Sequence, residues 1–434
     1  FASKDLMFGQ QSAGGYQISR SVRLRSSASA YLNRTFGTPT NNNKWTYSGW
    51  FKRGTLGANV ALFGNWETTQ GANQVYFNTS NQLVFFQNNS SGTNVLNYVT
   101  TQVFRDPAAW YHIVISYDNT LATTALNIYV NSSSQITAFG TSSNTATQNG
   151  NYSWNKSGLA HYLAVAKNTA NADFGYADGY FAEVNFIDGQ ALTSASFGYT
   201  DTATGVWQPA PYNGTYGNNG FYLNFKDPTS TTTIAYDYSG NGNNWTPNNI
   251  SVTAGTTYDS MVDVPINWGT DTGVGGEVRG NYAVVNPLSL ASSTTLSEAN
   301  LKGVSSTFNN LQSGTVAVSS GKWYWELTFG GSLGMVGIVP ASAPPTTDLG
   351  YTATSYGYRS SNGSKYNNGS ATAYGNTYTT NDVIGVALDL DNGKLFFSKN
   401  NTWQNSGDPA AGTNAAFTGL SGSFMPAAGT PDTT

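Results

Sequence analysis

The sequence predicts an all-β protein made of two antiparallel β-sandwiches that are joined by an extended linker. Short apolar runs recur along the chain and are separated by clusters of Asn, Gly, Ser and Thr. Aromatic residues make up 14% of the 434 residues, and glycines number 48, which is typical of strands and turns. Few residues favour helix over long windows, so we expect little helical structure.

The apolar runs define the predicted domain boundaries. Residues 1–43 form an N-terminal arm whose first strand is expected around Ile18, Val22 and Leu24. A first sandwich is predicted over 44–238, with strands at 44–54, 59–66, 74–80, 82–88, 110–118, 126–132, 180–192 and 221–227. Residues 239–305 are rich in Gly, Asn, Thr and Pro and are predicted to form the connector, with their few apolar side chains packed on a neighbouring domain. A second sandwich is predicted over 306–434, with strands at 321–331, 334–339 and 355–369.

The stretch 381–400, NDVIGVALDLDNGKLFFSKN, predicts a β-hairpin in the second sandwich. Alternation places Ile384, Val386 and Leu388 on one face. Asn392-Gly393 is a strong signal for a two-residue turn, which would pair Leu390 with Leu395. We therefore expect the hairpin to be stabilised mainly by burial, with Asp389 and Asp391 in structural roles.

Composition excludes several classes of function. Charged residues make up only 10% of the chain and the formal net charge is -4, so neither a nucleic-acid partner nor an anionic membrane surface is expected. No apolar run is long enough to cross a bilayer, and we expect no membrane insertion. Cysteine is absent, which excludes disulfides, thiolate metal sites and a cysteine nucleophile.

The sequence offers no clear catalytic constellation, and we expect a protein that is not an enzyme. The two histidines, His112 and His161, lie in apolar stretches and are interpreted as buried imidazoles with backbone partners. Glu183 and Glu326 each stand alone in a predicted strand, without the paired carboxylates that glycoside hydrolysis needs. Carboxylates from distant strands could still meet, so a polysaccharide-degrading enzyme remains an alternative.

Tryptophans in polar segments are the candidate ligand-binding residues. Trp66, Trp154, Trp245, Trp268 and Trp403 lie among Asn, Gly and Ser. An indole ring can stack on a sugar ring while nearby amides and carboxylates bind its hydroxyls. The other interpretation, that these rings cover domain edges or a subunit interface, is slightly favoured, and both stay open.

One loop could hold calcium. In DYSGNGNN, Asp237 and Asn241 provide oxygen ligands and the glycines free nearby carbonyls. An Asn/Gly turn is the favoured interpretation of the same residues, and calcium binding is left open. No other cofactor is expected.

Two motifs in the second sandwich resemble a SPRY domain. SGKWYWELTF is similar to the K-W-Y-W/F-E strand of that family, and Asp382, Ile384, Gly385, Asp389 and Gly393 fall on its G-D-x-I-G-x-x-x-D-x-x-x-G pattern, with Asn381 where the family usually has Gly. GSFMPAAG at 422–429 resembles the closing strand. The resemblance covers about 306–429 and implies a bent β-sandwich that binds partners through its loops.

The first sandwich resembles a laminin-G or concanavalin A-like domain. WYHIVISYDNT and LNIYVNS are similar to a family hairpin, and in ADGYFAEVNFIDGQALTSASF, Asp178, Gly179, Glu183, Ala191 and Leu192 fall on a second family pattern. DYSGNGNNWT resembles a motif that usually opens such domains but here follows the hairpin. A permuted or shared-edge strand order is therefore expected.

The order of these two domains, together with phrases such as GNYAVVNPL, resembles virion appendage proteins of marine, cyanophage-like tailed bacteriophages. The resemblance implies a location in the extracellular virion, other virion subunits as partners, and a homo-oligomer, by default a trimer. Two functions are expected from it. The first is a tail fibre or spike component that recognises a host surface glycan or partner protein, and the second is a purely architectural capsid-decorating or fibre subunit.

Overall fold

The computed structural model describes residues 16–135, 139–168, 170–265, 278–306, 310–331 and 333–430. Strands dominate this part of the chain, and the helices in it are 3₁₀ turns of three residues, so the predicted all-β fold is confirmed. None of these turns has the length or hydropathy to span a membrane. The described residues divide into two compact units, the first made of 16–282 with 297–299 and the second of 283–296 with 300–430.

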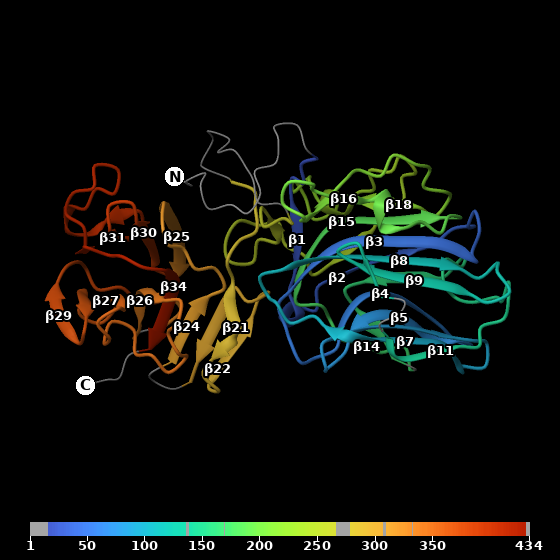
Figure 1. The fold of residues 1–434 in the computed structure, drawn as a ribbon, viewed down its shortest axis with the longest axis horizontal. Helices are drawn as coiled ribbons and strands as arrows, with labels where there is room; N and C mark the ends of the chain where they lie inside the picture. Colours follow the sequence, from blue (N-terminus) through green and yellow to red (C-terminus); the bar gives the residue numbers. More distant parts are fainter. Residues whose placement is uncertain are drawn as a thin grey trace. The chain divides into compact units, whose positions relative to one another are not determined.

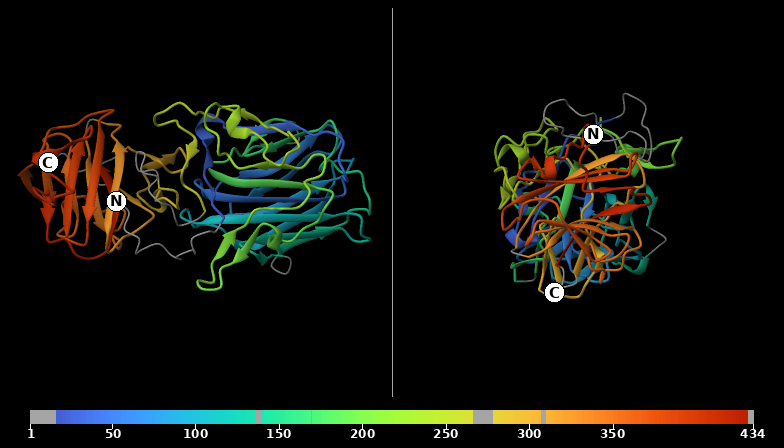
Figure 2. Two further views of the ribbon diagram at one scale, coloured as in Figure 1. Left: turned by 90° about the horizontal axis from the view of Figure 1, so that it is seen from above. Right: turned by 90° about the vertical axis from the view of Figure 1, so that its left-hand side faces the viewer.

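Two antiparallel sheets build the first unit (Figures 1 and 2). One sheet has the order β10 (Ser133–Ser134), β9 (Ala125–Val130), β8 (Trp110–Asp118), β3 (Lys44–Arg53), β15 (Gly179–Asp188), β1 (Ser21–Leu24) and β20 (Ser260–Met261), and β18 (Phe221–Leu223) also pairs with β15. The other sheet has the order β11 (Phe139–Asn144), β7 (Asn94–Val103), β6 (Gln82–Asn88), β5 (Gly71–Phe77), β4 (Val60–Glu67), β12 (Ala160–Leu163), β2 (Tyr31–Thr35) and β19 (Thr246–Asn248). Two small ladders join β13 (Ala166–Lys167) to β14 (Asp173–Phe174) and β16 (Gly198–Thr200) to β17 (Trp207–Pro209).

Strand β3 shows how alternation builds this unit, because both of its faces are buried. Trp45, Tyr47 and Phe51 point into the main core between the two sheets. Thr46 and Lys52 lie on the other face, where Thr46 Oγ1 donates to the Gln190 carbonyl and Lys52 bonds the segment after β20. The first unit therefore has a further polypeptide layer outside the sheet that contains β3.

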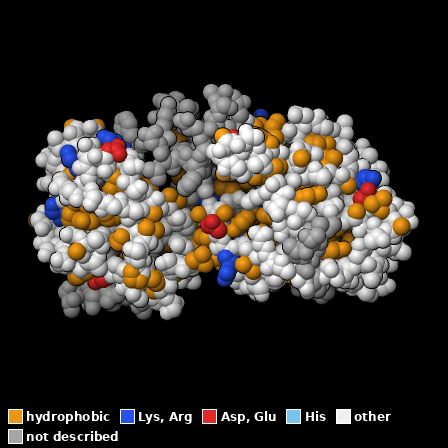
Figure 3. Space-filling view, in the orientation of Figure 1, with side chains coloured by type: hydrophobic (Ala, Val, Ile, Leu, Met, Phe, Trp, Pro, Cys, Tyr) orange, Lys and Arg blue, Asp and Glu red, His pale blue; other side chains and the backbone are white. Residues whose placement is uncertain are grey.

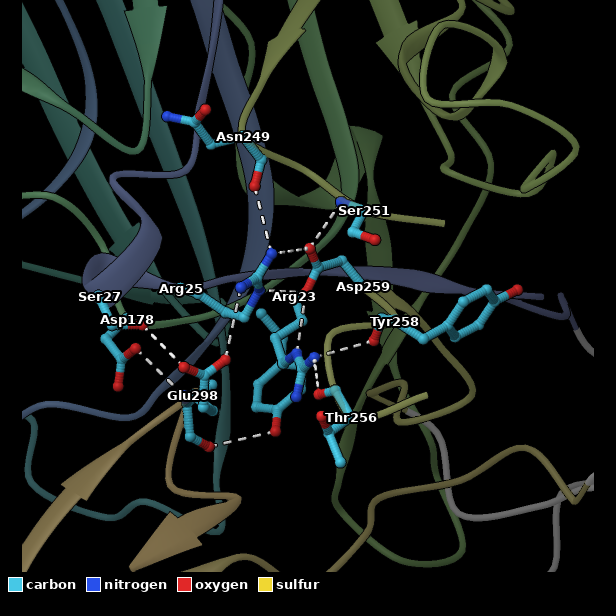
Figure 4. A network of polar contacts seen from close by, with 12 residues as sticks. Arg23, Arg25, Ser27, Asp178, Asn249, Ser251, Thr256, Tyr258, Asp259 and Glu298 are labelled. Atoms are coloured by element: carbon cyan, nitrogen blue, oxygen red, sulfur yellow. Dashed lines mark hydrogen bonds and ion pairs between the residues drawn. The ribbon is translucent and has the colours of Figure 1, made fainter. Parts of the chain in front are cut away.

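The segment 239–265, part of the predicted connector, packs on the first unit. It contributes β19 and β20, which pair with β2 and β1. A buried ion-pair network holds it in place (Figure 4): the Arg23 and Arg25 Nε atoms lie 3.0 and 2.8 Å from Asp259 Oδ1. Arg25 also pairs with Glu298, and the Ala299 amide donates to Asp178, so residues 297–299 join the same network. The domain boundaries given above stay predictions.

The second unit contains two larger antiparallel sheets and one short ladder. The first sheet has the order β21 (Val285–Leu290), β24 (Asn310–Gly314), β34 (Phe424–Thr430), β26 (Met335–Pro340), β27 (Tyr356–Arg359), β28 (Ser364–Asn367) and β29 (Ser370–Ala373). The second has the order β25 (Lys322–Thr328), β30 (Val383–Asp389), β31 (Lys394–Lys399) and β32 (Thr402–Trp403), and β33 (Phe417–Thr418) also pairs with β31. The short ladder joins β22 (Thr294–Ser297) to β23 (Lys302–Ser305).

The hairpin of β30 and β31 confirms the predicted buried face and corrects the predicted turn. Ile384, Val386 and Leu388 are buried in one apolar cluster. The predicted two-residue turn is wrong, because Leu388 pairs with Leu395 and the turn spans residues 390–393. A type I′ turn needs positive φ at both central residues, but of Asn392 and Gly393 only the glycine has it. Instead, the Asn392 backbone and side-chain amides both donate to the Asp389 carboxylate.

Candidate functional site

A pocket of about 330 Å³ opens on the first unit around Glu183. Its lining, here called the Glu183 pocket, is unusually rich in tyrosine: Tyr16, Glu183, Asn185, Pro211, Tyr212, Asn213, Gly214, Tyr216, Tyr222, Tyr238 and Ser239. The volume lies near the lower end of the range of about 300–1,000 Å³ typical of small-molecule sites. It is suited to a single small ring.

The position of Glu183 follows from the pairing of β15. On one edge, β15 pairs with β1 through residues 179–181 and with β18 through residues 184–186. Glu183 lies between these two partners, at an irregularity in the pairing with β3 between Ala182 and Asn185. Its φ of 51° is left-handed, which a non-glycine residue rarely adopts. The change of strand partner leaves the opening, and the bulge places a carboxylate in it.

Two tyrosine hydroxyls hold the Glu183 carboxylate. Tyr222, on β18, donates to Glu183 Oε2 at 2.6 Å. Tyr16, just before β1, donates to the same oxygen, and the oxygen atoms of the two hydroxyls are 2.6 Å apart. The three side chains, from three separate segments, therefore bring three oxygen atoms together, with both hydroxyl protons directed at the carboxylate.

Burial changes the protonation of this group. Glu183 is only 7% exposed, and burial raises its pKa to about 7, although the two tyrosine hydrogen bonds act in the opposite direction. Burial, followed by the nearby Glu183 charge, raises the pKa of Tyr16 and Tyr222, so both hydroxyls keep their protons. Glu183 thus gains or loses its proton close to neutral pH. The ionised carboxylate only accepts hydrogen bonds, whereas the protonated form can also donate one.

The loop after β17 supplies the other aromatic wall. Tyr212 and Tyr216 meet edge to face with ring centroids 5.1 Å apart, and Tyr212 also stacks on Phe197. The Tyr216 hydroxyl donates to Asn185 Oδ1 at 2.9 Å. This packing presents aromatic surface and amide groups beside one carboxylate, an arrangement that can hold a polar ring by stacking and hydrogen bonds.

Among the described residues, the tryptophans predicted as ligand contacts are not part of the lining of this pocket. Trp154 and Trp245 are 1% and 2% exposed, so neither ring has a face open to a ligand, and that prediction needs correction. Trp154 packs on Trp45 with ring centroids 5.2 Å apart, and Trp245 packs edge to face on Phe221. Their polar sequence neighbours lie at turns, while the rings themselves enter the core.

Trp66, Trp403 and Trp268 have different surroundings. Trp66 lies half-buried on β4. Trp403 is half-buried on β32 in the second unit and meets Tyr324 edge to face, with ring centroids 6.2 Å apart; the Tyr324 hydroxyl donates to Glu326. This small aromatic group is partly exposed and is separate from the Glu183 pocket. Trp268 lies outside the described residues.

The proposed calcium ligands are engaged in a turn. The Asp237 carboxylate accepts the backbone amides of Tyr222, Ser239 and Asn243 and the Ser239 hydroxyl. Asn241 donates its amide group to two backbone carbonyls. Within the described part of the chain, no group of three or more His, Cys, Asp or Glu side chains is placed to hold a metal ion. The geometry favours the turn.

The histidines and hairpin aspartates have structural surroundings. His112 and His161 are buried, and burial lowers the pKa of each to about 3, so both are neutral. His161 stacks on Phe36, and Trp207 donates its indole proton to His112. Asp389 pairs with Lys322, while Asp391 accepts the Gly321 amide.

Comparisons with known families agree with this architecture. A model of the concanavalin A-like lectin/glucanases superfamily matches residues 26–196, and a model of the SPRY domain matches residues 322–431. The chain carries a concanavalin A-like domain followed by a SPRY domain. Domains of these two kinds are typically binding modules for carbohydrates or proteins. The Glu183 pocket lies in the first unit, and of its lining residues Glu183 and Asn185 fall within the concanavalin A-like match.

Two solved structures show distant similarity to this chain. The stonustoxin structure is 23% identical over 34% of this chain and 25% of its own, with a TM-score of 0.28. A heptameric SAP-like pentraxin from Limulus polyphemus is 12% identical over 42% of this chain and 81% of its own, with a TM-score of 0.31. The chain thus spans about a quarter of the stonustoxin chain. No curated protein matches the sequence.

The tyrosines of the Glu183 pocket are not among the residues predicted from the sequence, where the candidate ligand contacts are tryptophans. A signal was present: PYNGTYGNNGFY at 211–222 places Tyr212, Tyr216 and Tyr222 among Gly and Asn. Glu183 also falls on the sequence pattern that resembles laminin-G or concanavalin A-like domains. Their meeting with Tyr16 depends on the strand order, which the sequence left open.

Proposed function

We propose that this chain is a non-enzymatic binding protein that takes an uncharged sugar ring in the Glu183 pocket. The observation that carries the proposal is the pocket lining, in which five tyrosines surround one buried carboxylate. Tyrosine rings can stack on the apolar face of a pyranose, while Glu183 and Asn185 bind hydroxyl groups. Charged residues make up only 10% of the chain, and they are few and scattered on the face drawn in Figure 3; so low a charge content favours a neutral ligand over a highly charged one.

We further propose that the protein is an appendage of a tailed bacteriophage virion, such as a tail fibre or spike component, that recognises a glycan on the host surface. The domain order and the phage-like phrases of the sequence support this assignment. A pocket of this size holds little more than one sugar, so each site alone would be weak. Repetition of the site in a homo-oligomer, by default a trimer, would raise the avidity through effective concentration.

Binding without catalysis is supported by the number of carboxylates. Glycoside hydrolases generally use two carboxyl groups that flank the scissile bond. Among the described residues that line the Glu183 pocket, Glu183 is the single carboxylate. Release of reducing ends from a host polysaccharide would instead support the polysaccharide-degrading alternative.

An architectural role is the second candidate. The second unit exposes large apolar side chains, with Leu288, Val304 and Tyr324 at 62%, 53% and 49% exposure. Exposed apolar surface of this kind is often covered by a neighbouring subunit. A capsid-decorating or fibre subunit would use these residues to bind other virion subunits and would bind no glycan.

A bacterial glycan array probed with the labelled full chain separates these functions. Wild-type protein should bind one structural class of glycan, and Tyr216→Ala should weaken that binding about fivefold, since packing of a ring against an aromatic side chain is worth about 1 kcal/mol. Tyr199→Ala, an exposed tyrosine of the same unit outside the pocket, should bind like wild type. Absence of binding to any glycan would reject the sugar site and favour the architectural role.

A further inference from the structure

Lys52 is a fully buried lysine in the first unit, with no exposed side-chain surface. It lies on β3, and its Nζ contacts three oxygens: Asp263 Oδ2 at 2.7 Å, Asn281 Oδ1 at 2.8 Å and the Tyr282 carbonyl at 2.6 Å. Lysine is almost never buried completely unless it is paired. Here the amine lies between a carboxylate and a side-chain carboxamide.

The surroundings hold these groups in place. A parallel bridge between Asp263 and Gly280 sets Asn281 beside the carboxylate. Trp110 Nε1 donates to Asp263 Oδ1 at 3.0 Å, and the Tyr180 ring centroid lies 5.7 Å from Lys52 Nζ. Burial raises the pKa of the Asp263 carboxyl, which makes it a better temporary proton acceptor.

We propose that Lys52 and Asn281 form an intramolecular amide bond, with Asp263 as the group that carries the proton. Lysine amines are nucleophiles when an adjacent base removes their proton. The arrangement supplies the amine, the base and the electrophilic carboxamide in contact before any reaction, which is the condition for a fast intramolecular step.

The reaction balances without an oxidant, a reductant or a cofactor. Lys52 gives a proton to Asp263, and the neutral Nζ attacks the Asn281 side-chain carbonyl carbon. Asp263 returns that proton to Asn281 Nδ2, the carbon–Nδ2 bond breaks, and the new nitrogen–carbon bond remains as a secondary amide. The second proton lost by Nζ leaves with the ammonia as ammonium, and Asp263 is a carboxylate again.

The two ends of the Asn281 carboxamide have different partners. Oδ1 accepts from Lys52 Nζ at 2.8 Å, while Nδ2 donates to the Ala108 carbonyl at 2.7 Å and must turn toward Asp263 to receive the proton. Asn281 is the exposed member of the group. Ammonia formed there can pass directly into solvent.

The bond would give this chain a covalent cross-link that it cannot obtain from disulfides. The chain has no cysteine, so no disulfide can cross-link it. An amide bond from Lys52 to Asn281 closes a very long loop and would restrict the unfolded chain as a disulfide does. It would fasten the segment around Asn281 to the central strand β3.

Mass spectrometry of the denatured full chain tests the proposal. Wild-type protein should weigh less than its sequence mass by one ammonia molecule, and a protease digest should contain a branched peptide that joins Lys52 to Asn281. The branched peptide is required, because succinimide formation at an Asn-Gly step also releases ammonia. An unchanged mass with separate Lys52 and Asn281 peptides would overturn the proposal and leave an ordinary ion pair.

Two variants define the mechanism. Lys52→Arg and Asp263→Asn should each keep the full sequence mass, whereas Lys167→Arg, which alters a partly exposed ion pair of the same unit, should lose ammonia like wild type. A branched peptide that joins Lys52 to Asp263 with loss of water would contradict the assignment of Asn281. The wild-type measurement decides the proposal even where a variant fails to fold.

Discussion

Replacing Glu183 by Gln should remove a pH dependence from the stability of the first unit. Burial raises the pKa of Glu183 from 4.5 to about 7 in the folded protein. An acid with a raised pKa binds its proton more tightly in the folded than in the unfolded state. Its contribution to stability is therefore fully present below about pH 4.5 and is lost as the pH rises to about 7.

The magnitude follows from the size of that rise. One pKa unit corresponds to about 1.4 kcal/mol between the two protonation states, so the free energy of unfolding should fall by about 3 kcal/mol across this interval. Glu183 is only 7% exposed, and solvent screening reduces the value little. A glutamine side chain cannot ionise, so the Glu183→Gln variant should lack this pH dependence. Above neutral pH wild type buries a charged carboxylate whereas the variant stays neutral, so the variant should be the more stable of the two.

Denaturant unfolding followed by tryptophan fluorescence at several pH values measures this difference. Trp45, Trp154 and Trp245 are buried in the core of the first unit and report its unfolding. The quantity of interest is the difference between wild type and Glu183→Gln, since it removes the contributions of the other acids. Glu326→Gln, the same change at an exposed residue of the second unit, serves as the control. Parallel pH profiles for wild type and Glu183→Gln would refute the reasoning.

Three further predictions concern the core, the ion-pair network and calcium. Leu388→Ala should destabilise the second unit by about 2–5 kcal/mol, because Leu388 is buried against the opposite sheet, and denaturant unfolding measures it. Asp259→Ala should destabilise the first unit by about 3–5 kcal/mol, because it leaves Arg23 and Arg25 buried without their shared carboxylate; a loss below about 1 kcal/mol in the same assay would contradict this. Chelation of calcium should leave the melting temperature unchanged, because Asp237 already accepts four hydrogen bonds, and a drop of several degrees on adding chelator would reverse that conclusion.

Strand positions were predictable because each depends on its own side chains. WYHIVISYD at 110–118 is β8, and KWTYSGWFKRG contains β3. In both cases bulky apolar residues alternate with smaller or polar ones, and the alternation itself sets the two faces. The buried face of the β30–β31 hairpin was predictable for the same reason.

Features that the alternation of apolar and polar residues does not encode were not predictable. The hairpin turn differs from its prediction because Asp389 captures the Asn392 amides, a side-chain effect that the Asn-Gly signal does not contain. Trp154 and Trp245 enter the core from polar loops, so their sequence neighbours gave the wrong indication of exposure.

The Glu183 pocket illustrates the same limit. Tyr16 and Tyr222 lie 206 positions apart, and their hydroxyls meet only because β15 exchanges one strand partner for another beside Glu183. A sequence without an established strand order cannot bring these residues together.

A crystal structure of the full chain with the glycan that it binds best on an array is the most direct test of the proposed sugar site. We predict a sugar ring packed against Tyr216 or Tyr212, with a hydroxyl within hydrogen-bond distance of Glu183 or Asn185. A sugar bound elsewhere on the chain, with the Glu183 pocket empty, would contradict the account.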